Sequence, residues 1–254
     1  MLAEYATLDT NEVAKLMFGS RPAAARHLNV LVRAGLVWRF VYDTDSTHRA
    51  HYEVSTTGVR LLADRLHRAG EPVPPNLASA QPDQLMVNNL VVGLTQAAKA
   101  SQGRSWLYGW RRGVDATIWL HSRGVTGVQP RAAGIWLQDG LAARFLLHID
   151  DGVSAPRLAQ MLDGYRHSRA GVPAGCILML TMTGSRETEL HEDLLNAPLP
   201  VPVATATFDR LNKASDASAP IWTLTGDTTR LVRLIDTVGN YHRPTGAADL
   251  KPPR

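Results

Sequence analysis

Along the first 68 residues, apolar positions first recur at helical spacing and then alternate with polar positions, as they do in strands. The predicted elements, in order, are a helix at Thr7–Phe18, a helix at 20–34, strands at Val37–Tyr42 and His51–Val54, and a helix from about Thr56. Gly35 ends the second helix, and a polar tip at residues 43–50 separates the two strands. This order predicts a winged helix-turn-helix, whose commonest use is to bind DNA in the major groove.

The second predicted helix has one apolar and one polar face. Ser20 can cap it, and Pro22 in its first turn suits a helix start. The inward positions are Ala25, Leu28, Leu31 and Val32, and the outward positions are Arg26, Asn29 and Arg33. Arg and Asn read guanine and adenine edges, so the predicted DNA-binding residues are Arg21, Arg26, Asn29, Arg33, Arg39, His48 and Arg49. The alternative is that these are ordinary solvated residues of an amphipathic helix.

From about residue 84 to 238 the pattern alternates between helix and strand. Helices are predicted near 87–98, at Pro156–His167 (begun by Ser154), at Glu187–Leu195, and after Asp227, where the last helix holds Leu231, Leu234 and Val238. Strands are predicted at Trp106–Trp110, Ala116–His121, Ala132–Leu137, Leu141–Ile149, Cys176–Met182 and Val201–Phe208. Asp139-Gly140 is a hairpin signal, and the unbroken apolar run at Cys176 indicates a buried central strand. The whole predicts an α/β domain with a mixed sheet.

Proline density marks a boundary between these two patterns. Residues 71–83 hold four prolines, which break helices and make a semi-rigid connector. The predicted organisation is a winged helix at 1–70, a linker at 71–83, an α/β domain at 84–238 and a loose tail at 239–254.

Composition narrows the partners. The formal net charge is +4 with a pI of about 9.5, which fits a nucleic-acid partner. Of 27 basic residues only four are lysine, and arginine suits phosphate contacts, although codon bias in a GC-rich genome explains the excess equally well. A single cysteine, Cys176, excludes an internal disulfide. With no visible signal peptide, membrane-spanning run or glycine-rich phosphate loop, we expect a cytoplasmic protein that needs no membrane and no cofactor.

The order of several short motifs resembles the replication-relaxation family of actinobacterial plasmids, integrative elements and phages. The motifs are Leu16-Met17-Phe18 before the 26–36 helix, Gly58, Leu85–Leu94, Pro130, the run Phe145–Gly152, and Leu158–Tyr165. The resemblance implies a winged helix followed by a domain similar to the restriction-endonuclease fold. It also implies an association with plasmid replication and DNA relaxation.

The family's acidic site is altered in this chain. Where the family commonly has Pro-Asp this sequence has Pro130-Arg131, and the family's Glu-x-Asp position reads His148-Ile149-Asp150. The lysine usual in the following helix is also missing, since Gln160 and Met161 stand there. Hard divalent cations need carboxylate oxygens, and a cation at residue 131 repels them. The resemblance therefore implies a degenerate site at Arg131, His148 and Asp150 that holds no metal.

Two further interpretations of the acidic residues stay open. A carboxylate from elsewhere, Asp115 or Asp151, could take over the metal-binding role. His148 and Asp150 share one face of a strand, because alternate residues do. They form either an acid/base or metal pair, or a structural hydrogen-bonded pair.

The sequence thus predicts a DNA-binding accessory protein of mobile-element replication or transfer, with an inactive nuclease-like domain. Its predicted partners are double-stranded DNA, a replication or transfer protein, and a second copy of itself in a homodimer. One alternative is a metal-dependent nicking endonuclease. The other is a dimeric winged-helix transcriptional regulator.

Overall fold

The computed structural model describes residues 2, 7–41, 49–69, 82–150, 155–167, 172–214 and 216–238. The chain divides into two compact units, Met1–Val92 and Gly93–Arg254, so the division falls inside the helix α5 (Pro82–Ala100). The predicted linker lies outside the described residues except for its last two positions, and the predicted tail lies wholly outside them.

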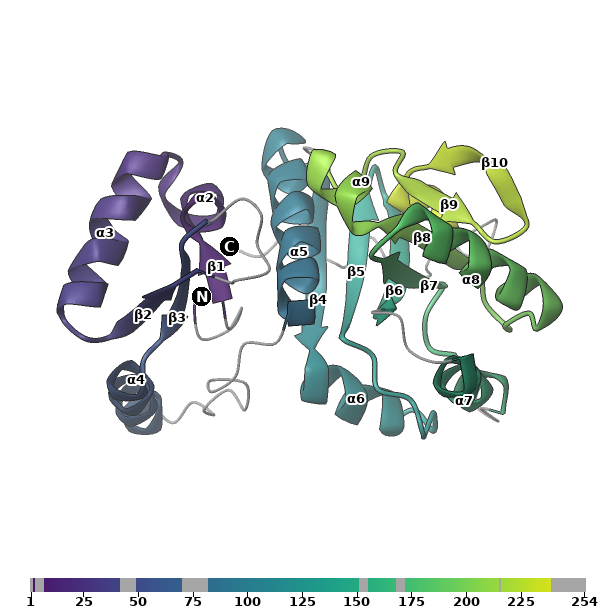
Figure 1. Ribbon diagram of the computed structural model, residues 1–254, viewed down its shortest axis with the longest axis horizontal. Coiled ribbons are helices and arrows are strands. Elements are labelled where there is room, and N and C mark those ends of the chain that lie inside the picture. Colours follow the sequence, from purple (N-terminus) through teal and green to yellow (C-terminus); the bar gives the residue numbers. More distant parts are fainter. Residues whose placement is uncertain are drawn as a thin grey trace. The chain divides into compact units, whose positions relative to one another are not determined.

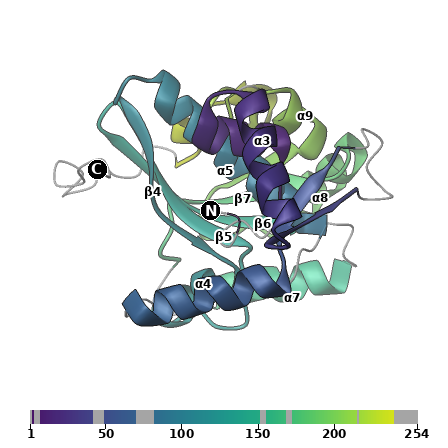
Figure 2. The same cartoon turned by 90° about the vertical axis from the view of Figure 1, so that its left-hand side faces the viewer.

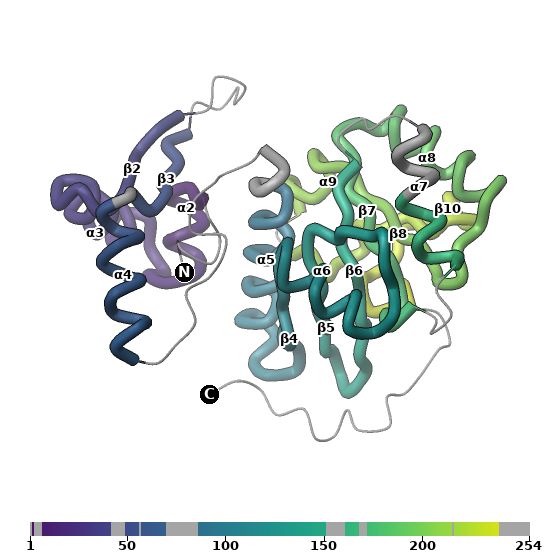
Figure 3. Tube along the Cα trace, turned by 90° about the horizontal axis from the view of Figure 1, so that it is seen from below, coloured from purple at the N-terminus to yellow at the C-terminus, as the bar shows by residue number. Residues whose placement is uncertain are grey.

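Unit 1 combines a small sheet with helices. Its elements are β1 (Thr7–Asp9), α2 (Thr10–Val13), the π-helical η1 (Ala14–Phe18), α3 (Arg21–Arg33), β2 (Val37–Phe40), β3 (His51–Val54) and α4 (Thr56–Ala69). The antiparallel strands lie in the order β1-β3-β2, and β2 runs beside β3 (Figure 3). In Figures 1 and 2, α3 lies toward the top of this unit and α4 toward the bottom. Residues 42–48, which include most of the wing tip predicted at 43–50, lie outside the described residues.

The predicted first helix begins three residues too early. Thr7–Asp9 is a strand that pairs with β3, placing Leu8 opposite Tyr52. The helix begins at Thr10 because Asp9 and Glu12 form a capping box. The Glu12 N–H donates to Asp9 Oδ1 at 2.7 Å, and the Asp9 N–H donates to Glu12 Oε2 at 2.5 Å.

The inner face of α3 includes the predicted Leu28, but Ala24 is buried there and the predicted Ala25 is only half-buried. Leu28 is buried together with Ala24, while Leu31 and Val32 are half-buried. Ser20 occupies the N-cap position, but its side chain makes no capping hydrogen bond, so the predicted capping role is wrong. The core of the unit consists of Leu8, Val13, Ala14, Ala24, Leu28, Val37 and Tyr52.

Unit 2 is built on a seven-stranded mixed sheet (Figure 1). After α5 come β4 (Ser105–Arg112), α6 (Gly113–His121), β5 (Ala132–Gln138), β6 (Leu141–Asp150), α7 (Ala155–Arg166), β7 (Cys176–Thr181), α8 (Gly184–Asn196), β8 (Val203–Thr207), α9 (Phe208–Lys213), β9 (Trp222–Leu224), β10 (Asp227–Val232) and the 3-10 helix η2 (Leu234–Val238). The strand order is β10-β9-β8-β7-β6-β5-β4. Strands β6, β7 and β8 are parallel and the other pairs are antiparallel, so the predicted α/β fold with a mixed sheet is confirmed.

Alternate residues of the central strands pack beneath three helices. One core cluster joins strand residues Ala133, Leu146, Ile177, Met179 and Val203 to helix residues of α6, α7 and α8, among them Leu120, Leu162, Tyr165, Leu190 and Leu194. Every residue of β7 is buried, as its unbroken apolar run predicts for a central parallel strand.

Two predicted elements of unit 2 are wrong. Residues 116–121 belong to the helix α6 and not to a strand, and the buried positions Ala116 and Leu120 are one helical repeat apart. Asp227 does not begin a helix, because it starts the strand β10, and its Oδ1 accepts a hydrogen bond from Thr229 Oγ1 at 2.7 Å. Among the described residues after β10, only the short η2 is helical.

Candidate functional sites

The outer face of α3 carries the residues predicted to read DNA bases. Arg26, Asn29 and Arg33 are all exposed, opposite the buried Ala24 and Leu28. Val30 lies on the same face at the same helical spacing, and 63% of its surface is exposed. Val30 is not among the predicted DNA-binding residues, although an apolar residue outside the predicted core face was a signal for it. The face therefore offers two guanidinium groups, an amide and an apolar side chain to solvent.

Three other predicted residues converge elsewhere in unit 1. Arg21 from the first turn of α3, Arg39 from β2 and Arg49 from just before β3 line one hollow of about 280 Å³. We call this the arginine hollow, and its other lining residues are Asp9, Thr10, Asn11, Ala50 and Tyr52. Arg49 Nη1 lies 3.5 Å from Asp9 Oδ2. His48, the remaining predicted DNA-binding residue, lies outside the described residues.

The carboxyl group next to Asp9 is uncharged at neutral pH. Glu12 is buried, and burial, reinforced by the negative charge of Asp9, raises its pKa to about 8. Glu12 therefore adds no negative charge beside the arginine hollow at pH 7. Among the described lining residues of the hollow, Asp9 is the one that has a carboxylate, and it lies near Arg49.

In unit 2, polar side chains form two rows near the carboxyl ends of the parallel strands. Asp150 of β6 is in register with Thr181 of β7, which is in register with Thr207 of β8. Two steps earlier along the strands, His148 and Thr205 flank Met179. Open α/β sheets bind ligands outside the carboxyl ends of their strands, so a ligand-binding or catalytic site is expected at this edge.

Arg131 and His148, two of the three residues of the predicted degenerate site, lie side by side near this edge of the sheet. The N–H of Arg131 donates to the carbonyl oxygen of Leu147 at 2.8 Å, which puts residue 131 beside His148 of β6. His148 Nε2 lies 2.6 Å from the hydroxyl of Tyr165. Burial, together with the charge of Arg131, lowers the pKa of His148 to about 3, and burial raises the pKa of Tyr165. His148 is therefore a neutral, buried side chain held by a tyrosine from α7.

Asp150 has a cationic partner. Only 1% of it is exposed, and the Nε–H of Arg186 donates to its Oδ2 at 2.7 Å. Arg186 comes from the first turn of α8 and also binds Glu189 Oε2 at 2.9 Å. His148 and Asp150 thus bind different partners. No group of three His, Cys, Asp or Glu residues that could hold a metal ion occurs among the residues that the structure describes.

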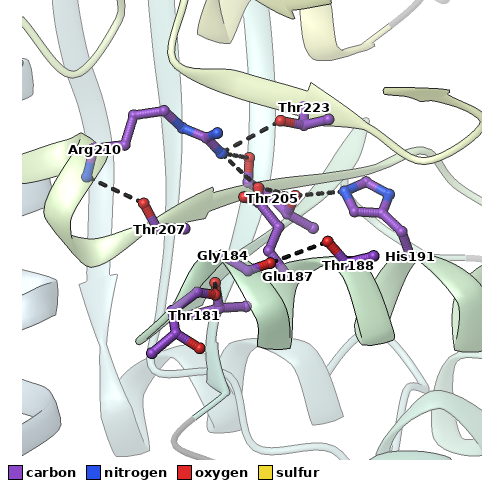
Figure 4. A network of polar contacts seen from close by, with 10 residues as sticks. Thr181, Gly184, Glu187, Thr188, His191, Thr205, Thr207, Arg210 and Thr223 are labelled. Carbon is purple, nitrogen blue, oxygen red and sulfur yellow. Dashed lines mark hydrogen bonds and ion pairs between the residues drawn. The ribbon is translucent and has the colours of Figure 1, made fainter. Parts of the chain in front are cut away.

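A second polar cluster, which was not predicted from the sequence, joins α8 and α9 to β8 (Figure 4). Thr205 Oγ1 donates to Glu187 Oε1 at 2.5 Å and lies 2.8 Å from His191 Nε2. Arg210 binds the same Glu187 oxygen and also reaches Thr223 Oγ1 at 3.3 Å. Glu187 and His191 are four residues apart on a helix and so lie on the same face. The sequence does not indicate which strand that face packs against.

The geometry of this second cluster suits a structural role. Thr205, Glu187 and His191 are all buried, and the charge of Glu187 is balanced by Arg210. Burial lowers the pKa of His191, which keeps the imidazole neutral. Charge-balanced, hydrogen-bonded groups of this kind hold packed elements in a defined arrangement.

Comparison with known proteins gives one match. The family model described as Replication-relaxation matches residues 1–174. The match includes the outer face of α3, the arginine hollow, Arg131, His148 and Asp150, and it ends before Arg186 and the second polar cluster. No protein with curated annotation and no solved structure matches the chain. In the described part of the chain, no helix is long and apolar enough to cross a membrane.

Proposed function

The chain belongs to the replication-relaxation family, and from that membership we propose that it serves mobile-element replication or transfer by binding double-stranded DNA through unit 1. The observation that carries the proposal is the exposed face of α3. Two arginines, Asn29 and the exposed Val30 lie there within two helical turns. Arginine recognises guanine, asparagine recognises adenine, and an apolar side chain contacts the thymine methyl group.

The proposal is tested with a duplex selected by the protein itself. The full chain would be used to enrich a random-sequence duplex pool, and affinity for the best duplex would then be measured by fluorescence anisotropy at fixed salt. We expect Arg26→Ala and Arg33→Ala each to weaken binding by about 5- to 150-fold, because a base-edge contact is worth roughly 1–3 kcal/mol. Both variants should also discriminate less well between duplexes.

Arg65→Ala is the matched control. Arg65 is exposed on α4, so its removal makes the same charge change in the same unit. Wild-type affinity in both helix variants, with unchanged circular dichroism, would refute DNA reading by α3. Mapping of bound DNA in the host separates the roles, since promoter-bound protein would be a transcriptional regulator and origin-bound protein a replication accessory.

We further propose that unit 2 has lost metal-dependent cleavage and serves contacts to DNA or to a replication or transfer protein. The ion pair of Asp150 supports this proposal, because the guanidinium of Arg186 lies where a divalent cation would need to bind that carboxylate. Magnesium sites usually combine one or two carboxylates with substrate oxygens. Here the one retained acidic residue is already neutralised by an internal cation, and residue 131 carries a positive charge.

A further inference from the structure

The arginine hollow brings together charges from three elements that are distant in the sequence. Arg21 begins α3, Arg39 lies on β2, and Arg49 precedes β3. Three arginines that line one hollow bring like charges together, which is unfavourable unless a negative charge balances them. Such an arrangement is stabilised when an anion occupies the hollow.

Among the described residues of unit 1, little neutralises these arginines. Asp9 lies 3.5 Å from Arg49, and its other oxygen accepts the N–H of Glu12. Within the described residues, no ion pair joins Arg21 or Arg39 to a carboxylate. Within the described part of the chain, Arg21 and Arg39 therefore lack an acidic partner, so an anion from outside could neutralise them.

The remaining lining groups are hydrogen-bonding groups of the right kind. The hydroxyls of Thr10 and Tyr52 lie 3.5 Å apart at the hollow, and Asn11 adds an amide. Hydroxyl, amide and guanidinium groups are the usual protein contacts to phosphate oxygens, and the planar guanidinium binds two of those oxygens at once. The hollow is thus suited to a phosphate group rather than to a carboxylate-rich partner or an apolar ligand.

We propose that the arginine hollow holds one phosphate group of the DNA backbone and thereby fixes the position of α3 on the duplex. The proposal rests on the proposed DNA-binding function and adds a sequence-independent anchor to it, since phosphate contacts set register while base contacts set specificity. Because Arg21 and Arg39 line one hollow while Arg49 pairs with Asp9, these two arginines act on the same phosphate and not on two different ones.

That sharing has a measurable signature. The full chain would be titrated with its selected duplex and with an unrelated duplex over a series of salt concentrations, using Arg21→Gln, Arg39→Gln and the double variant. The slope of log affinity against log salt falls in magnitude by about 0.9 for each phosphate that the protein no longer neutralises. If both arginines hold one phosphate, the slope of the double variant falls by about 0.9, and the two single effects on affinity are not additive. The change should be the same for both duplexes.

Controls and contrary results separate this proposal from the proposed function. Arg65→Gln is the matched charge control, and thermal unfolding verifies that each variant folds. If the wild type binds DNA and the double variant behaves like Arg65→Gln, the hollow is not a phosphate anchor, while DNA binding stands. A slope change of about 1.8 with additive effects would mean two separate phosphates and would overturn the shared site.

Inorganic phosphate distinguishes the source of the anion. If no duplex binds, but phosphate raises the unfolding temperature of the wild type and not of the double variant, the hollow binds a free phosphate, and both the backbone assignment and the proposed function are wrong. If neither duplex nor phosphate binds, the hollow is not a phosphate site of any kind.

Discussion

Replacing Glu12 by Gln tests the charge state next to the arginine hollow. In the folded protein the pKa of Glu12 is raised to about 8 from an ordinary value of 4.5, chiefly by burial. Between these two values the unfolded chain releases the proton and the folded chain keeps it. Since the folded pKa is the higher one, the stabilisation is present in full below pH 4.5 and is lost as the pH rises to about 8.

The size of this effect follows from the shift. One pKa unit corresponds to about 1.4 kcal/mol, so the free energy of unfolding of unit 1 should fall by roughly 3 kcal/mol between pH 5 and pH 7.5. Glutamine has nearly the same shape, can still accept the N–H of Asp9, and does not ionise. Glu12→Gln should therefore remove this part of the pH dependence and should be the more stable protein at pH 7.5.

Hydrogen exchange of α3 amides, corrected for intrinsic rates, reports the opening free energy of unit 1 without interference from unit 2. Asp64→Asn is the control, because Asp64 is an exposed acid on α4. Wild type and Glu12→Gln with parallel pH dependence would mean that Glu12 ionises normally in the folded state. The arginine hollow would then face a second negative charge at neutral pH.

Three other outcomes are expected. Arg186→Met should destabilise unit 2 by about 3–5 kcal/mol, since it leaves Asp150 buried without its cation, and urea unfolding that shows a decrease below about 1 kcal/mol would contradict this. Supercoiled plasmid incubated with the purified protein and Mg²⁺ or Mn²⁺ should stay intact on a gel, whereas nicking that disappears in Asp150→Ala would show a working site. Light scattering should find a homodimer at micromolar concentration, because the winged helix predicted from the sequence is of a class that often binds two-fold sites as dimers, and a monomer at high concentration would count against it.

Local signals predicted the elements that depend on local geometry. Asp139 and Gly140 both have positive φ angles, 49° and 78°, as an Asp-Gly hairpin turn requires, and the hairpin of β5 and β6 lies where the sequence predicted it. The start of the first helix is also encoded in the sequence as Asp9-x-x-Glu12, a capping box that the apolar pattern of Thr7–Phe18 obscures. The short apolar run in α6 is compatible with a strand as well as a helix, so its secondary structure is set by packing against the rest of the unit and not by the local pattern.

In the candidate site of unit 2, only the residues that lie on or beside the β5–β6 hairpin could be placed together from the sequence. Arg131, His148 and Asp150 come from a family pattern that follows one hairpin, so their proximity could be anticipated. Arg186 lies 36 residues beyond Asp150, on a helix whose first turn reaches β6 only through the packing of the complete sheet. Local periodicity carries no information about such a long-range contact.

The ion pair between Arg186 and Asp150 would also make the proposed loss of metal chemistry hard to reverse. An acidic residue restored at position 131 or 148 would still find Asp150 occupied by a guanidinium. Removing Arg186 first would take this cation away from the buried carboxylate of Asp150, at a cost of about 3–5 kcal/mol, a large part of the stability of a typical domain. Each single-step path back to a metal centre therefore passes through either an inert protein or a poorly folded one, so selection acting on one substitution at a time would keep the present state.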